Sequence, residues 1–188
     1  PTWTPPEIKS ALALTAAQTV LLEDQVTPAN PFARGSGRVQ VDRAINAGLV
    51  MNETTANYNA ANPATGGNPT TLNQPNLFNR SCFPTCVFFR TFRNTGATAT
   101  TYRVQLVGLS GAVTPFITVP GNGSLTVKFT VYGFSLPTNG TTSFGTAVLI
   151  LAAPSLADAM SYPCPSRMDS SVSRPRGSSS TMSILLIM

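Results

Sequence analysis

The strongest constraint on the fold is a series of segments in which apolar and polar residues alternate. From residue 124 to residue 131 the sequence reads Ser-Leu-Thr-Val-Lys-Phe-Thr-Val, so every second side chain is apolar. Similar segments, separated by turns rich in Gly, Asn and Pro, cover residues 87–93, 101–107, 116–119 and 142–151. Because successive side chains of a strand point to opposite faces, this pattern indicates strands with one buried face. Their spacing of about ten residues predicts an antiparallel β-sandwich over residues 82–158.

The composition favours a mainly β, exported protein. Of the 188 residues, 42 % are hydrophobic and only 10 % are charged, where about a quarter is usual. The formal net charge is +5, but the 12 Lys and Arg residues are scattered and form no basic run. We therefore expect no nucleic-acid partner. No apolar run approaches the roughly 18–20 residues that a membrane-spanning helix needs, so no membrane span is expected.

The first residues predict a short helix. Thr4 suits the N-cap, Pro5 suits the first helical position, and Glu7 completes a capping box. The expected buried stripe, at helical spacing, consists of Ile8, Ala11, Leu12 and Thr15. The helix is too short to start a self-sufficient domain, and little apolar sequence nearby could cover it. We therefore interpret it as the end of a larger unit.

The next segment predicts a loop followed by a second short helix. Gly35 and Gly37 stand where we expect two main-chain segments to approach closely. Asp42 is the expected N-cap of the helix, and Gly48 the expected glycine just after its end. A phosphate-binding loop is disfavoured, because the third glycine and the flanking long strand and helix are missing.

Two polar segments flank the alternating strands. Residues 51–81 are rich in Asn, Thr, Pro and Gly and predict a linker or a long surface loop. Residues 159–188 contain a Ser-, Arg- and Pro-rich stretch without a strand pattern, together with the lone Cys164. We expect this tail to be disordered, or to result from a reading-frame error near Ala159.

The sequence contains three cysteines and no histidine. Cys82 and Cys86 are separated by three residues. A zinc site would need two further ligands, which the chain does not offer as histidine or as a second cysteine pair. We expect a disulfide between Cys82 and Cys86, which implies an oxidising compartment. The alternative is two reduced cysteines beside a strand. No metal-binding and no cofactor-binding residues are predicted.

Two segments resemble parts of the peptidase domain of subtilisin-like serine proteases (subtilases). Trp3-Thr-Pro-Pro-Glu-Ile-Lys-Ser-Ala-Leu12 resembles the segment that follows the helix carrying the catalytic serine. Asn30-Pro-Phe-Ala-Arg-Gly-Ser-Gly-Arg-Val-Gln-Val-Asp-Arg-Ala-Ile-Asn-Ala-Gly-Leu-Val50 resembles the closing segment of the same domain. The two occur in the order that the family has. The resemblance implies that residues 1–50 are the C-terminal end of an α/β subtilisin-like domain.

The strand-rich part resembles the fibronectin type III-like module that follows the peptidase domain in many large subtilases. Arg90-Thr-Phe-Arg-Asn-Thr-Gly96 is similar to the opening of that module, and a cysteine pair before the first strand resembles exported proteobacterial members. The implied fold class is mixed and mainly β, with a helix-and-loop remnant followed by an antiparallel β-sandwich. The implied protein is a secreted bacterial serine endopeptidase that acts through a Ser-His-Asp triad and an acyl-enzyme.

This sequence cannot supply that triad, because it has no histidine. Ser10, Ser36 and Ser81 lack the family's nucleophile motif, which would be expected before Pro1, and Glu23-Asp24 predicts a solvated turn. We therefore predict no catalytic residue here. The expected partners are the N-terminal catalytic portion and, through it, protein or peptide substrates. The alternative is a secreted β-sandwich binding or adhesion protein whose first fifty residues are a capping arm.

Overall fold

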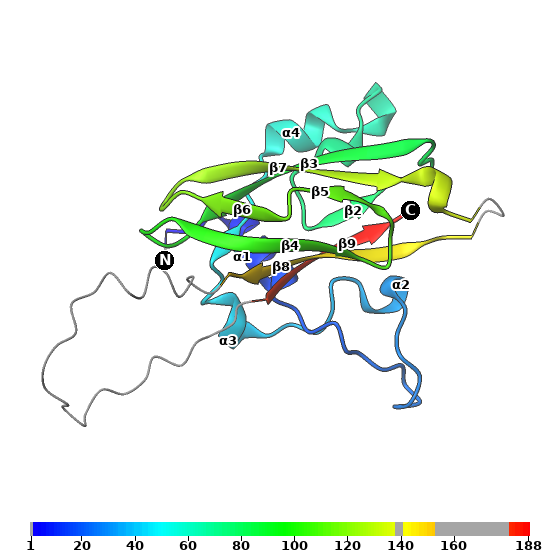
Figure 1. The fold of residues 1–188 in the computed structure, drawn as a ribbon, viewed down its shortest axis with the longest axis horizontal. Coiled ribbons are helices and arrows are strands. Elements are labelled where there is room, and N and C mark those ends of the chain that lie inside the picture. The colour runs from blue at the N-terminus through cyan, green and yellow to red at the C-terminus, as the bar shows by residue number, and fades with distance from the viewer. Residues whose placement is uncertain (1, 138–140, 153–180) are drawn as a thin grey trace, which may run out of the picture.

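The computed structural model describes residues 2–137, 141–152 and 181–188, which form two β-sheets and a few helices (Figure 1). The strands are β1 (Leu49–Val50), β2 (Asn76–Phe78), β3 (Thr85–Asn94), β4 (Thr100–Val107), β5 (Gly111–Val113), β6 (Phe116–Val119), β7 (Ser124–Tyr132), β8 (Phe144–Leu151) and β9 (Thr181–Ile187). The α-helices are α1 (Pro5–Leu14), α2 (Pro31–Arg34), α3 (Val41–Ala44) and α4 (Thr55–Ala60). Three 3-10 helices are η1 (Pro63–Thr65), η2 (Pro69–Thr71) and η3 (Gly133–Ser135). The protein is mainly β, as the alternation predicts.

The first sheet has the strand order β1-β3-β7-β5, and the second has the order β2-β9-β8-β4-β6. The long β3 and β7 pair antiparallel, with Phe88 opposite Phe129. One pairing departs from the antiparallel expectation, because β2 runs parallel to β9. The expected strands are present as β3, β4, β6, β7 and β8, and β1, β2, β5 and β9 are additional.

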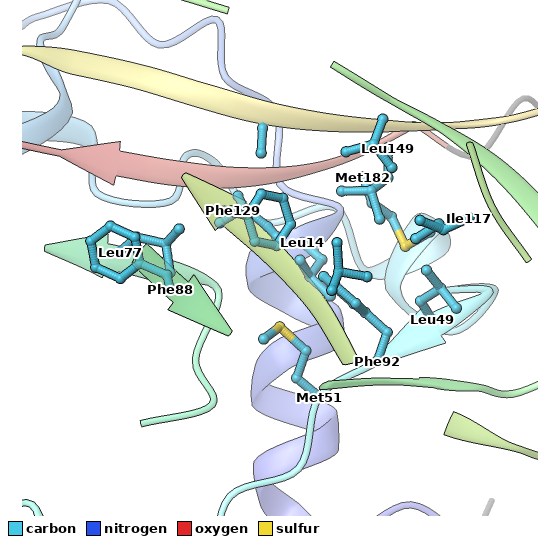
Figure 2. Packing of buried hydrophobic residues seen from close by; sticks show 14 of the residues in the cluster. Leu14, Leu49, Met51, Leu77, Phe88, Phe92, Ile117, Phe129, Leu149 and Met182 are labelled. Atoms are coloured by element: carbon cyan, nitrogen blue, oxygen red, sulfur yellow. The ribbon is translucent and has the colours of Figure 1, made fainter. Parts of the chain in front are cut away.

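The inward side chains of both sheets form one hydrophobic cluster. It includes Phe88 and Phe92 from β3, Phe129 from β7 and Leu149 from β8 (Figure 2). In β3 buried and exposed residues alternate along most of the strand, as the sequence predicts. Burial of each large apolar side chain in this cluster stabilises the fold by about 1.5–3 kcal/mol relative to an exposed position.

Helix α1 begins as the sequence predicts but buries a different face. Thr4 is the N-cap, and its reciprocal hydrogen bonds with Glu7 form the capping box. The buried residues of the helix are Glu7, Ser10, Ala11 and Leu14. The expected stripe is therefore wrong for Ile8, which is 47 % exposed. The spacing of apolar residues does not predict this buried face, because two of its four residues, Glu7 and Ser10, are polar and are buried with specific partners.

The N-terminal residues pack against the two sheets. Leu14 of α1 lies in the same cluster as Met51, Phe92 of β3 and Met182 of β9 (Figure 2). A second, smaller cluster joins α1 to α3 through Ala11, Ala44, Ala47 and Val50. The described part of residues 1–50 thus shares the core of the strand-rich part.

The glycine loop before α3 brings two main-chain segments together, as expected. Gly37 has a φ of 112°, and the next residue, Arg38, exchanges main-chain hydrogen bonds with Ala17 at 2.8 and 2.9 Å. A Cβ on Gly37 would lie 2.3 Å from the Ala17 carbonyl oxygen. A side chain at this position is therefore excluded by both conformation and space.

The expected ends of α3 are wrong. The helix begins at Val41 with Gln40 as its N-cap, so Asp42 lies inside the first turn. Gly48 is needed for close packing: a Cβ there would lie 2.5 Å from the hydroxyl oxygen of Tyr102. Tyr102 is buried in the core beneath it. A distant strand, rather than the turn chemistry of the helix end, explains this glycine.

The two polar segments contain more structure than their composition predicts. Residues 51–81 contain α4, η1, η2 and β2, and Leu77 of β2 is fully buried. At the end of the chain Thr181–Ile187 forms β9, so the expectation of disorder is wrong for these residues. Strand β9 lies between β2 and β8 because its apolar side chains complete the core. Residues 159–180, including Cys164, lie outside the described residues.

Candidate functional site

A polar hollow of about 320 Å³ lies where α1, the start of α4 and strand β3 meet. It is lined by Glu7, Asn52, Glu53, Asn57, Asn73, Thr91, Arg93 and Ser124. Glu7 comes from the N-terminal helix, whereas Thr91 and Arg93 point outward from β3. The hollow therefore lies at the junction between the N-terminal helix and the first sheet.

Glu7 and Arg93 form an ion pair in this hollow. The Arg93 Nε donates to Glu7 Oε1 at 2.6 Å, and Glu7 Oε2 accepts the Thr4 N–H at 2.8 Å. Burial alone would raise the pKa of Glu7, but the hydrogen bond and charge of Arg93 and the bond from Thr4 outweigh it. The pKa of Glu7 is therefore lowered, and the carboxylate is ionised at neutral pH.

Glu53 is the second buried carboxylate of the hollow. It accepts hydrogen bonds from the Thr54 N–H at 2.8 Å, from Asn57 Nδ2 at 2.6 Å and from the Asn73 N–H. Burial acts to raise its pKa, but these hydrogen bonds and the positive charge of Arg90 lower it overall. The Glu53 carboxylate thus binds both the start of α4 and the segment after η2, and it holds the two segments together.

Arg90 lies on the inward face of β3 and is only 2 % exposed. Its Nε donates to the Gln74 carbonyl oxygen at 2.9 Å, and its other nitrogens donate to the carbonyl oxygens of Thr70 and Phe89. Burial lowers the pKa of Arg90 to about 10, although the Glu53 charge acts in the opposite direction. The guanidinium is still charged at neutral pH, and it holds residues 70–74 against β3.

Asn73 occupies the edge of β3 much as a neighbouring strand would. Its Oδ1 accepts the Thr91 N–H at 2.8 Å, and its Nδ2 donates to the Thr91 carbonyl oxygen at 2.9 Å. The same Nδ2 donates to the Asn52 carbonyl oxygen at 3.0 Å. One amide side chain therefore satisfies main-chain groups of β3 that would otherwise lie at an open edge.

These contacts make the hollow a structural junction. A carboxylate that acts as a general base needs a pKa near the working pH and must reach a substrate proton. Glu7 and Glu53 are both ionised, and each is engaged by several donors. The arrangement therefore has a structural role: it holds α1 and residues 51–74 on the first sheet.

The three serines considered from the sequence have separate structural partners. Ser10 Oγ donates to the Glu7 carbonyl oxygen and accepts the Met51 N–H, both at 2.8 Å. Ser36 Oγ donates to Asn76 Oδ1 at 3.2 Å. The Ser81 N–H donates to Asn79 Oδ1 at 2.9 Å.

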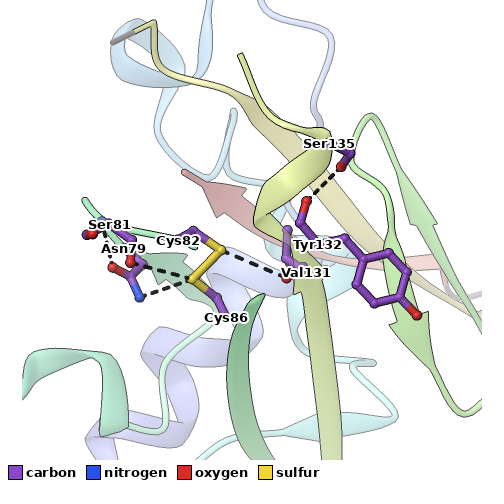
Figure 3. Close-up of a disulfide and its surroundings, with 7 residues drawn as sticks. All are labelled: Asn79, Ser81, Cys82, Cys86, Val131, Tyr132 and Ser135. Atoms are coloured by element: carbon purple, nitrogen blue, oxygen red, sulfur yellow. Dashed lines mark hydrogen bonds between the residues drawn. A yellow bond between two sulfur atoms is a disulfide. The ribbon is translucent and has the colours of Figure 1, made fainter. Parts of the chain in front are cut away.

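The expected disulfide joins Cys82 and Cys86 just before and within the start of β3 (Figure 3). Asn79 Nδ2 lies 3.2 Å from the Cys86 sulfur, and the Gly133 N–H donates to the Pro84 carbonyl oxygen at 2.8 Å. A Cβ on Gly133 would collide with the Cys82 carbonyl oxygen. The disulfide loop is therefore packed tightly against the end of β7.

The Glu23-Asp24 pair lies in an exposed turn, as the sequence predicts. Asp24 accepts hydrogen bonds from the Val26 and Thr27 N–H groups and from the Thr27 hydroxyl. The Thr27 hydroxyl and the two N–H groups lower the pKa of Asp24. This carboxylate stabilises a turn.

Among the residues that the structure describes, no group of three or more His, Cys, Asp and Glu residues could hold a metal ion. The described helices are also too short or too polar to cross a lipid bilayer.

Sequence reasoning did not single out Arg90, Glu53 or Asn73. A signal for Arg90 was present, because it occupies an inward position of β3 between Phe88 and Phe92. A charged residue at a core position requires buried partners. The partners themselves lie in residues 51–81, where no periodicity marks them.

No family model matches the chain. Two subtilisin-like proteases of Arabidopsis thaliana match in part: one is 44 % identical over 62 residues and the other 36 % identical over 63 residues. Each match covers 31 % of this chain and 8 % of the relative, so the chain spans a small part of their length. Both relatives are plant proteins, and they give no support to the expected bacterial source. About a third of this chain is thus similar to plant subtilisin-like proteases.

Proposed function

We propose that this chain is a C-terminal part of a subtilisin-like serine endopeptidase. The observation that carries the proposal is its partial similarity to two subtilisin-like proteases. In this proposal residues 1–50 end the peptidase domain. The two sheets are a fibronectin type III-like β-sandwich, to which β9 contributes a strand beyond the expected boundary at residue 158.

The whole protein would hydrolyse peptide bonds through a serine nucleophile and an acyl-enzyme, with histidine as the base. This chain has no histidine and contributes structural support. By resemblance, α1 follows the helix that bears the nucleophile. Glu7, Ser10 and Leu14 connect α1 to Arg93, to Met51 and to the core. We propose that the two sheets hold α1, and through it the catalytic serine, in position.

We also propose that the protein functions outside the cytoplasm. The disulfide between Cys82 and Cys86 supports this location, because disulfides persist in oxidising compartments.

The test is to read the genomic sequence upstream of Pro1 and to express the whole reading frame. We expect Asp, His and Gly-Thr-Ser motifs upstream, and labelling of the whole protein by a fluorophosphonate probe that reacts with activated serines. Residues 1–188 alone should not be labelled. An upstream frame without these motifs, or a whole protein that the probe does not label, would contradict the proposal.

The same experiment tests the support role. Arg93→Gln should slow labelling of the whole protein by weakening the attachment of α1, whereas Arg103→Gln should not. Arg103 is an exposed arginine on β4, outside the junction. Equal labelling rates for the two variants would remove the support role and leave the family assignment intact.

The alternative function is that of a secreted β-sandwich binding protein. It is favoured by exposed aromatic side chains around a hollow at one end of the sheets, lined by Phe32, Phe78 and Phe83 among others. An upstream frame that encodes a signal peptide or a second sandwich, without protease motifs, would support this alternative.

A further inference from the structure

Two hollows adjoin at the end of strand β2. The larger, of about 660 Å³, is lined by Phe32, Phe83 and Met188 among other residues, and the smaller, of about 400 Å³, by Leu72 and Arg90 among others. Phe78, Asn79 and Arg80 line both. We refer to the two hollows and residues 78–80 between them as the β2 groove.

The β2 groove exposes aromatic surface. Phe78 is 49 % exposed, Phe32 is 65 % exposed and Phe83 is 78 % exposed. Single exposed apolar residues are ordinary, but several that line one hollow mark a binding surface. The groove therefore favours a ligand with apolar groups.

The charge available in the groove is positive. Among the residues that the structure describes, the charged residues that line it are Arg80 and Arg90, and no Asp or Glu lines either hollow. Arg90 is already bound to main-chain carbonyl groups. Arg80 is exposed and has no hydrogen bond or ion pair to any residue that the structure describes. A guanidinium in this state can pair with a carboxylate through charge-assisted hydrogen bonds.

The groove also presents an unpaired strand edge. Within the described part of the chain, strand β2 is the outermost strand of the second sheet and pairs with β9 on one side only. The Asn79 N–H donates to the Ile187 carbonyl oxygen at 3.1 Å. Because neighbouring residues of a strand direct their main-chain groups to opposite sides, the N–H and C=O of Phe78 face away from β9. An extended peptide can pair with such groups.

The groove is held in shape before any ligand binds. Asn79 Oδ1 accepts a hydrogen bond from the Ser81 N–H, and Asn79 Nδ2 lies within hydrogen-bond distance of the Cys86 sulfur (Figure 3). Cys86 is joined to Cys82 by the disulfide. The Gly133 contact fixes the same loop against β7. A preorganised groove loses less entropy on binding than a flexible one.

We propose that the β2 groove binds an extended peptide in which an acidic residue lies between apolar residues. The carboxylate pairs with Arg80, the apolar side chains contact Phe78 and Phe83, and the peptide main chain adds to the edge of β2. Binding itself does not depend on the proposed function. A role of this binding in selecting acidic, apolar stretches of a protein substrate does rest on the proposed endopeptidase function.

The test is fluorescence anisotropy of residues 1–188 with the labelled peptide Gly-Phe-Asp-Leu-Gly. The matched controls are the same peptide with Asn and with Lys in place of Asp. We expect the Asp peptide to bind about tenfold more tightly than the Asn peptide, as one charge-assisted contact allows. The Lys peptide should bind most weakly.

Two variants test the site itself. Arg80→Gln should abolish the preference for Asp over Asn, and Phe83→Ala should weaken all three peptides. Arg103→Gln removes another exposed arginine, outside the groove, and should change nothing. Absence of binding, equal binding of the Asp and Lys peptides, or an unchanged preference in Arg80→Gln would overturn the proposal. Because no catalysis is measured, these outcomes are distinct from failure of the fluorophosphonate test.

Discussion

The Arg93 Nε lies 2.6 Å from Glu7 Oε1, although 86 positions separate the two residues in the sequence. Glu7 also belongs to the capping box of α1, and Arg93 stands near the end of β3. One carboxylate therefore completes a local helix start and fixes that helix to a distant strand. This ion pair joins the N-terminal helix to the first sheet.

Removing one partner of this pair should destabilise the fold. Arg93→Gln leaves the nearly buried Glu7 without its cation and should lower the free energy of unfolding by about 1–3 kcal/mol. Arg93 is partly exposed, so the coupling in a double-mutant cycle with Glu7→Gln should be only about 1 kcal/mol. Urea denaturation measures both values. Glu23→Gln, at an exposed position without this pairing, is the matched control. Strictly additive single variants would show that the pair contributes nothing.

Stability should fall in acid because of Glu7 and Glu53. Both carboxylates have pKa values below the ordinary 4.5 in the folded protein. The unfolded chain then binds protons at a higher pH than the folded chain does. Their contribution is therefore complete above about pH 4.5 and is lost as the pH falls through the folded pKa values. Unfolding curves between neutral pH and pH 3 should show a shallower loss for Glu53→Gln than for the unmodified protein. An identical slope would contradict this account.

Arg90 should be the most sensitive charged position. Arg90→Met removes the donors of the Gln74 and Thr70 carbonyl oxygens and leaves Glu53 without its neighbouring cation. Breaking such a buried network costs about 3–5 kcal/mol. The exposed control Arg103→Met should change the unfolding free energy by less than about 0.5 kcal/mol. A similar small effect for both would mean that residues 70–74 are held by other contacts.

The role of β9 in the core can be tested at Met182. This side chain is fully buried, and Met182→Ala should lower the unfolding free energy by about 2–5 kcal/mol. The less buried neighbour provides the control, Ser183→Ala, which should have little effect. In the folded protein, the amides of Thr181–Ile187 should also be protected from hydrogen exchange. Rapid exchange of these amides would show that the strand is not formed.

Two glycines of one loop allow a matched comparison of space and conformation. Gly35 and Gly37 both have positive φ, but only Gly37 faces a main-chain oxygen within contact distance. Gly35 has φ 56° and ψ −130°, a region that side chains rarely adopt, so Gly35→Ala should cost about 1–3 kcal/mol from conformation alone. Gly37→Ala adds a collision with the Ala17 carbonyl group and should cost clearly more. Equal losses in thermal denaturation would indicate that the loop moves to accommodate the methyl group.

Local rules in the sequence determined strands β3, β4, β6, β7 and β8, the start of α1 and the disulfide. Alternation places every second side chain of β3 and β7 on one face, whatever lies opposite. The Thr4–Glu7 capping box and the Cys82–Cys86 pair involve residues only a few positions apart. Such features depend on neighbouring residues, and the sequence alone therefore predicts them.

Tertiary structure alone decided the junction, the buried face of α1 and the place of β9. Glu7 is buried because Arg93 comes to meet it, and Arg90 is tolerated in the core because carbonyl groups from residues 70–74 surround it. Gly48 is required by Tyr102, and β9 is ordered by the two strands beside it. Each of these depends on partners far away in the sequence. Desolvated charges and strand edges gain their stability only when the folded chain brings those partners together.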